Sequence, residues 1–99
     1  MTRIVTESKL IMQAEKLIRA QIRWRCRRGM LECDLFLIAF FDACFDELTE
    51  EEQETFVELL DSPDPELLAW LMGHDKPQDQ AFQAMIQKIR SFKYNRQCD

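Results

Sequence analysis

The segment Met30–Phe45 constrains the fold more than any other part of this chain, because thirteen of its sixteen residues are apolar. Only Glu32, Asp34 and Asp42 interrupt it. A helix that is apolar on nearly every side is stable only when other elements cover it. This segment therefore predicts a central helix. Its longest unbroken apolar run, residues 35–41, is far shorter than the ~20 residues of a membrane span, so no membrane insertion is expected.

Four other segments repeat apolar residues at the spacing of one helical face. These helices are expected at about 8–28, 49–60, 65–72 and 78–93. Two valines and few threonines argue against strands. The sequence therefore predicts an all-α fold, a compact five-helix bundle that forms a single domain over residues 1–99.

Local signals mark several helix ends. Thr49, with Glu52 three residues later, forms a capping-box pattern. Asp64 is expected to cap the fourth helix, with Pro65 at the first helical position. Gly29 is expected to end the first helix, because glycine adopts a positive φ without steric cost.

Residues for common catalytic and cofactor sites are scarce. With two glycines in the whole chain, no phosphate-binding loop of the P-loop or dinucleotide type can form. A single histidine, His74, and cysteines whose spacing is unlike that of zinc-ligand pairs argue against a metal site. The cysteines, at positions 26, 33, 44 and 98, are expected to be free thiols of a reducing compartment, three of them in the core. The chain is not expected to be an enzyme.

Charge divides the chain into three parts, around a net charge of −5. Residues 1–28 carry eight basic and two acidic side chains, residues 29–79 one and fifteen, and residues 80–99 four and one. This separation predicts a positive edge that meets a partner. Nucleic-acid binding through the basic face Arg19–Arg28 is one alternative, although the negative net charge argues against the broad positive surface that phosphates require.

The segment Arg23–Asp34 holds the strongest candidates for a binding site. On a continuous first helix, Arg28 would project on the apolar side, which a solvated face of arginines does not explain. Glu32 has a structural alternative, because a carboxylate in the first turn of a helix meets free N–H groups or pairs with Arg28. Trp24 is expected in the core or at its rim rather than as a stacking platform.

The string Arg28-Gly29-Met30-Leu31-Glu32 resembles the R-G-x-x-E motif of the flavinylation factors of succinate dehydrogenase, the SdhE or YgfY-type proteins of bacteria, which have mitochondrial relatives. The resemblance covers about residues 21–89 and includes Phe40-Phe41, Trp70-Leu71-Met72 and Lys76-Pro77. Residues 1–15 look like an extension to which no family role transfers.

This resemblance implies a five-helix bundle that acts as an assembly factor. Family members bind the flavoprotein subunit of succinate dehydrogenase, and in some bacteria that of fumarate reductase, and promote covalent attachment of FAD. The FAD then belongs to the client and the factor has no cofactor of its own, while binding of free FAD by the factor is left open. The family's docking surface corresponds here to Arg28, Gly29 and Glu32, with Arg27 and Asp34 beside them.

We expect a bacterial cytoplasmic protein rather than one of the mitochondrial matrix. Apolar area at the motif is compatible with a monomer or a weak homodimer, and the net charge of −5 argues against a nucleic-acid partner. The alternative function is a small antitoxin-like regulator that binds another protein.

Overall fold

The computed structural model describes residues 18–98 of the chain. A helical segment over residues 18–25 comes first. It is followed by α2 (Leu31–Cys44), the 3-10 helix η1 (Phe45–Glu47), α3 (Glu50–Leu59), α4 (Asp64–Leu71) and α5 (Gln80–Asn95). Residues 18–98 contain no strand, which confirms the predicted all-α bundle of five helices. None of the helices in this range is long and apolar enough to span a bilayer.

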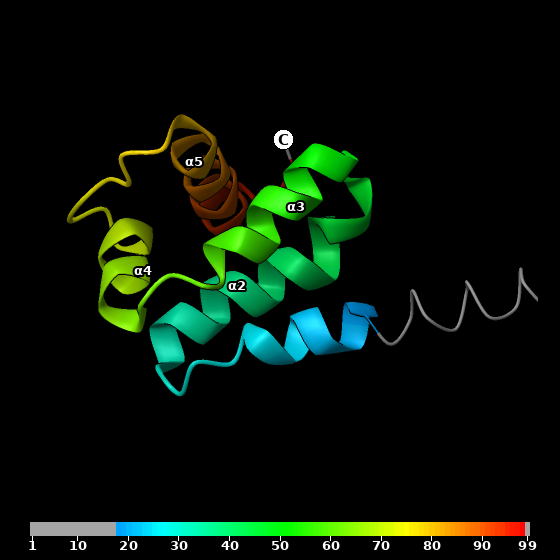
Figure 1. Ribbon diagram of the computed structural model, residues 1–99, viewed down its shortest axis with the longest axis horizontal. Helices are drawn as coiled ribbons and strands as arrows, with labels where there is room; N and C mark the ends of the chain where they lie inside the picture. Colours follow the sequence, from blue (N-terminus) through cyan, green and yellow to red (C-terminus); the bar gives the residue numbers. More distant parts are fainter. Residues whose placement is uncertain (1–17, 99) are drawn as a thin grey trace, which may run out of the picture.

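The apolar helix α2 lies at the centre of the bundle, as predicted (Figure 1). It packs against α4 and α5, and the segment 18–25 runs along its other side. The ring of Phe40, which is fully buried, stacks on Phe56 of α3 at 5.9 Å and meets the ring of Phe92 of α5 edge-on at 6.2 Å. Neighbours on several sides thus explain why most of the apolar side chains of α2 are buried.

Helix ends that depend on local contacts agree with the sequence. At the start of α3, the Thr49 side chain accepts a hydrogen bond from the Glu52 backbone N–H at 3.2 Å, and the Glu52 carboxylate accepts from the Thr49 N–H at 3.0 Å. This reciprocal pair is the predicted capping box. Gly73, two residues after the end of α4, has a φ of +81°, the left-handed conformation that favours glycine. Gly29 has the same φ, but it lies in the loop four residues beyond the end of the first helix.

Three other predicted helix ends are wrong. The first helix ends at residue 25 rather than at Arg28, and its predicted beginning lies outside the described residues. The fourth helix has Pro63 at its N-cap without a side-chain hydrogen bond, and Asp64 is already helical. The fifth begins at Gln80 because the Asp79 side chain accepts from a backbone N–H at its start, at 3.1 Å.

The cysteine prediction is correct for burial and wrong for bonding. Cys26, Cys33 and Cys44 are completely buried, as expected, and the first two are free thiols. Cys44 and Cys98 instead form a disulfide, with their Cα atoms 5.3 Å apart. The residues just after α5 lie beside the end of α2, a proximity that 54 positions of sequence separation do not reveal.

Candidate functional site

The predicted motif lies in the loop between the helical segment 18–25 and α2. The Asp34 carboxylate accepts a hydrogen bond from the Arg28 backbone N–H at 2.6 Å, which holds the loop over the first turn of α2. At the centre of this loop is Gly29, and a Cβ added there would meet no atom within 4 Å. The glycine backbone therefore faces open space, where the backbone of another protein can approach.

The Arg28 side chain is directed into the protein. Only 16% of it is exposed. One guanidinium nitrogen donates to the Leu60 carbonyl oxygen at the end of α3, and Nε lies 3.5 Å from the Asp64 carboxylate at the start of α4. Nε makes no hydrogen bond within residues 18–98, so the Asp64 contact is an ion pair without one. The contacts described for Arg28 thus connect the loop to the junction of α3 and α4.

Beside Gly29 the surface is hollowed into a depression of about 580 Å³, which we call the motif face. It is lined by Arg27, Gly29, Leu31, Asp34, Leu35, Ile38 and Ala39. Leu31 is 74% exposed and Leu35 49% exposed, and because both line the same depression they form a contiguous apolar patch rather than scattered surface leucines. The motif face therefore combines an apolar surface with one basic and one acidic side chain.

Trp24 extends this apolar surface. Its side chain is 69% exposed, and the Arg27 guanidinium lies over the indole ring at 5.6 Å. Arg27 also lines the motif face, so the Trp24 indole lies next to this face, in contact with one of its lining residues. The expectation that Trp24 lies in the core or at its rim is wrong: within the helical segment 18–25 it follows the buried Ile22 by two residues, a rotation of about 200° that places it on the opposite, outer side.

Glu32 is exposed at the second position of α2. The N-cap is Met30 and makes no side-chain hydrogen bond, and Glu32 pairs with neither Arg28 nor any other residue from 18 to 98. Glu32 thus has the first-turn position near the positive end of the helix dipole that one structural alternative expects, but within residues 18–98 it does not form the ion pair with Arg28 that the other expects. The structure brings Arg27, Gly29 and Asp34 to the motif face, leaves Glu32 exposed beside it and places the Arg28 side chain behind it.

Sequence reasoning missed Leu31, Leu35 and Trp24 as surface residues. A usable signal was the composition of α2, because a helix with thirteen apolar residues in and around it has more than the neighbouring helices can cover. That excess indicates an exposed apolar strip without showing which residues form it.

The arginines of the predicted basic face do not form a free positive surface. Three of them pair with acids of neighbouring elements: Arg19 with Asp46 at 2.7 Å, Arg23 with Asp42 at 2.7 Å, and Arg25 with Asp61. The hydrogen bonds from Arg23 lower the pKa of the Asp42 carboxyl. The side chains of these arginines remain partly exposed to solvent, and their ion pairs link the segment 18–25 to neighbouring elements.

The two free thiols, Cys26 and Cys33, lie on either side of the motif loop in the sequence, and both have low reactivity. Burial raises the pKa of Cys26 to about 12 and that of Cys33 to about 11. Both are therefore protonated near neutral pH and are weak nucleophiles. Within residues 18–98, no three His, Cys, Asp or Glu side chains are grouped so that they could hold a metal ion.

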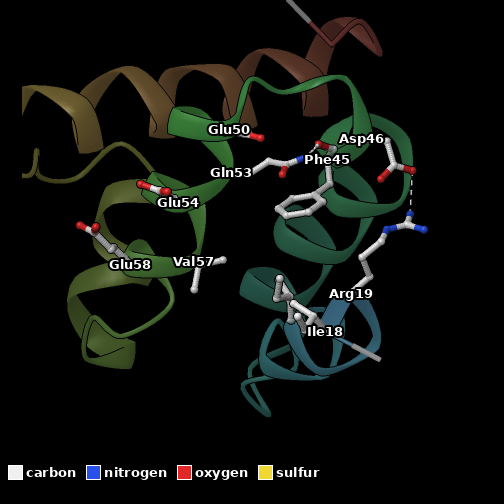
Figure 2. A pocket seen from close by; sticks show the side chains of 10 residues that line it. Ile18, Arg19, Phe45, Asp46, Glu50, Gln53, Glu54, Val57 and Glu58 are labelled. Carbon is white, nitrogen blue, oxygen red and sulfur yellow. Dashed lines mark hydrogen bonds and ion pairs between the residues drawn. The ribbon is translucent and has the colours of Figure 1, made fainter. Parts of the chain in front are cut away.

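A second depression of about 620 Å³ lies between the segment 18–25, η1 and α3 (Figure 2). Figure 2 shows Val57 of α3 facing Ile18 and Phe45 across the opening, with Glu54 and Glu58 along the α3 side. Arg19 and Asp46 close one side with their ion pair. This depression shares no lining residue with the motif face.

Comparison with known proteins points to one family. Residues 20–93 match the model of the family Sdh5, described as the flavinator of succinate dehydrogenase. A protein of Vibrio cholerae named FAD assembly factor SdhE is 54% identical over 71 residues, which cover 72% of this chain and 83% of that protein. The protein of that name from Coxiella burnetii is 49% identical over 76 residues, covering 77% and 93%. A solution structure of a UPF0350 protein is similar with a TM-score of 0.66 at 48% identity, covering 84% of this chain and 86% of that one.

Proposed function

Because the chain belongs to the family of flavinators of succinate dehydrogenase, we propose that it is an assembly factor that binds the flavoprotein subunit of succinate dehydrogenase and promotes covalent attachment of FAD. The observation that carries this proposal is the motif face. Relatives named FAD assembly factor match this part of the chain at about 50% identity. In this chain the same part exposes an apolar surface around an open glycine.

In this proposal the motif face is the docking surface. Leu31, Leu35 and Trp24 supply apolar area that a partner would remove from water, and aromatic residues are common anchors of such interfaces. The free Glu32 carboxylate offers an acceptor to donors of the flavoprotein. Arg28 and Asp34 contribute indirectly, by fixing the loop that presents Gly29.

The factor then acts by positioning, and bond formation belongs to the flavoprotein and its FAD. Two thiols with raised pKa values are poorly suited to nucleophilic work, which supports a role in binding rather than catalysis. Holding the flavoprotein in a conformation that brings flavin and acceptor side chain together lowers the entropic part of the barrier without any supplied acid or base. The factor needs no cofactor of its own for this role.

The proposed setting follows the relatives, which are bacterial proteins. We place the factor in the bacterial cytoplasm as a monomer or a weak homodimer, with the flavoprotein of fumarate reductase as a second client. Nucleic-acid binding and an antitoxin-like role are less well supported, because Arg19, Arg23 and Arg25 already pair with acids of the chain.

The test is co-expression with the succinate dehydrogenase flavoprotein of the same organism, in cells that lack their own factor. Covalent flavin is measured as in-gel fluorescence after denaturation. We expect fluorescence that requires the chain and decreases about tenfold or more with Glu32→Ala or Leu31→Ser, because hot-spot residues dominate interfaces.

Matched controls separate the motif face from general surface effects. Glu66→Ala removes another exposed acid from the first turn of a helix, and Tyr94→Ser removes a side chain that is 71% exposed, close to the 74% of Leu31. Both controls should keep full fluorescence. Complete flavinylation without the chain would refute the assembly role, and equal losses in controls and test variants would refute the docking surface.

A further inference from the structure

Arg90 of α5 is a partly buried cation without an acidic partner. Its Nε is buried and makes no hydrogen bond within residues 18–98, and the side chain forms no ion pair there. By contrast Lys88, two residues earlier on α5, pairs with Glu52 at 3.1 Å. Buried donors are normally hydrogen-bonded, so the buried Nε of this arginine, in a side chain without an ion pair, leaves room for an acceptor that residues 18–98 do not supply.

Gly73 makes the space in which the Arg90 guanidinium lies. A Cβ added at Gly73 would come within 2.9 Å of Nη2 of Arg90, closer than real Cβ contacts, and within 3.2 Å of its Cζ, a tight contact. With φ of +81°, Gly73 also holds a conformation that other residues rarely adopt. The turn after α4 is thus shaped to accommodate this guanidinium.

The guanidinium borders a pocket of about 330 Å³ between the turn after α4 and α5. Its wall includes Trp70, Lys76 and Gln83. Gln83 donates from its side-chain amide to the Pro77 carbonyl oxygen at 2.7 Å, which ties the loop to α5. Asp75 is the acid in this wall, and its carboxylate accepts from the Lys76 backbone N–H at 2.8 Å instead of pairing with Arg90. Two cations and one carboxylate leave an excess of one positive charge.

We propose that this pocket binds a carboxylate group, with the Arg90 guanidinium as its principal donor. The planar fork of a guanidinium matches the two oxygens of a carboxylate. An excess of one positive charge matches a single carboxylate better than a phosphate dianion. The carboxylate can come from a small organic acid or from an Asp or Glu side chain of a partner protein. The pocket shares no lining residue with the motif face, so the inference does not depend on the proposed function.

The test is an NMR titration of the full-length ¹⁵N-labelled chain with sodium acetate and with sodium succinate, against sodium chloride at equal ionic strength. The probes are the Arg90 Nε–Hε signal and the Trp70 indole signal. We expect saturable shifts with both acids and not with chloride. In Arg90→Lys, which keeps the charge but loses the fork, the Trp70 response should weaken about tenfold.

Two further variants make the result specific. Arg96→Lys makes the same change at an exposed arginine just after α5 and should leave the titration unchanged. Gly73→Ala should remove the response, because its Cβ would displace the guanidinium, and circular dichroism reports whether the helices persist.

The form of binding identifies the source of the carboxylate. Succinate binding clearly stronger than acetate binding indicates a free organic acid, whereas similar millimolar affinities indicate a carboxylate that a protein partner supplies. Shifts that chloride reproduces, or an unchanged response in Arg90→Lys, would overturn the proposal.

Discussion

Arg28 belongs to the sequence motif, yet its guanidinium contacts the chain itself. Three polar contacts converge on this residue, from the Asp34 carboxylate to its backbone and from its side chain to Leu60 and Asp64. In the proposed docking surface its role is therefore indirect: it holds the loop that carries Gly29. An arginine that positions a loop and an arginine that touches a partner produce the same sequence pattern.

This role leads to a prediction about stability. Arg28→Ala should lower the free energy of unfolding by about 1–3 kcal/mol, because the Leu60 carbonyl oxygen would lose the hydrogen bond that the guanidinium donates to it. Arg27→Ala, at the exposed neighbouring position, should change it by less than about 0.5 kcal/mol. Urea unfolding followed by circular dichroism measures both. Equal effects of the two changes would mean that the inward contacts of Arg28 contribute nothing to stability.

Among the elements, α3 has the most strongly defined beginning. Glu52 accepts from the Thr49 backbone and pairs with Lys88 of α5, so one carboxylate both caps α3 and connects it to α5. These contacts, with the Thr49 backbone first, lower the pKa of Glu52 below its ordinary value of 4.5. Because the pKa is lower in the folded state, the contacts stabilise the fold above pH 4.5, and this stability is lost as the pH falls.

Replacing this carboxylate should therefore change the pH dependence. Glu52→Gln is expected to lower the free energy of unfolding at pH 7 by about 0.5–1 kcal/mol, with a smaller difference from the unmodified chain near pH 3. Urea unfolding at both pH values measures the two differences. Glu51→Gln, at the exposed neighbouring position, is the matched control. A constant difference at both pH values would show that the ionised carboxylate is not what Glu52 contributes.

The elements also show which structure can be predicted from sequence. The capping box of Thr49 and Glu52 was predictable because both partners lie within one turn. Asp64 was predicted as a cap on the same kind of local reasoning, but its carboxylate lies near Arg28, 36 residues earlier, and a distant partner leaves no local signal. The motif loop was located by its residues, whereas the exposure of Leu31 depends on which side of α2 its neighbours cover.

For the whole molecule, the all-α fold followed from apolar spacing, because a single central helix determines where the others can pack. The disulfide between Cys44 and Cys98 did not follow, since its formation depends on how the chain returns after α5. In a reducing compartment such a pair is held as thiols, and in an oxidising one as the disulfide. The oxidised and reduced forms are therefore expected to differ in stability rather than in fold.

Breaking this bond should be measurable. Reduction, or Cys98→Ser, is expected to lower the free energy of unfolding by about 2–4 kcal/mol, because the bond closes a long loop and restricts the unfolded chain. Mass spectrometry after alkylation of the unfolded protein should count two free thiols before reduction and four after it. Four alkylated thiols in the unreduced protein would contradict the bond, and unchanged stability after reduction would contradict its energetic role.

The same bond divides the chain into a covalent ring and an open arm. The ring contains α3, α4 and α5, and the arm contains the motif loop and most of α2. If the oxidised chain were pulled from its two ends, the force would extend the arm alone. The 54-residue separation corresponds to roughly 190 Å of extended chain, at about 3.5 Å for each residue. This length cannot be extended by the force until the disulfide is reduced.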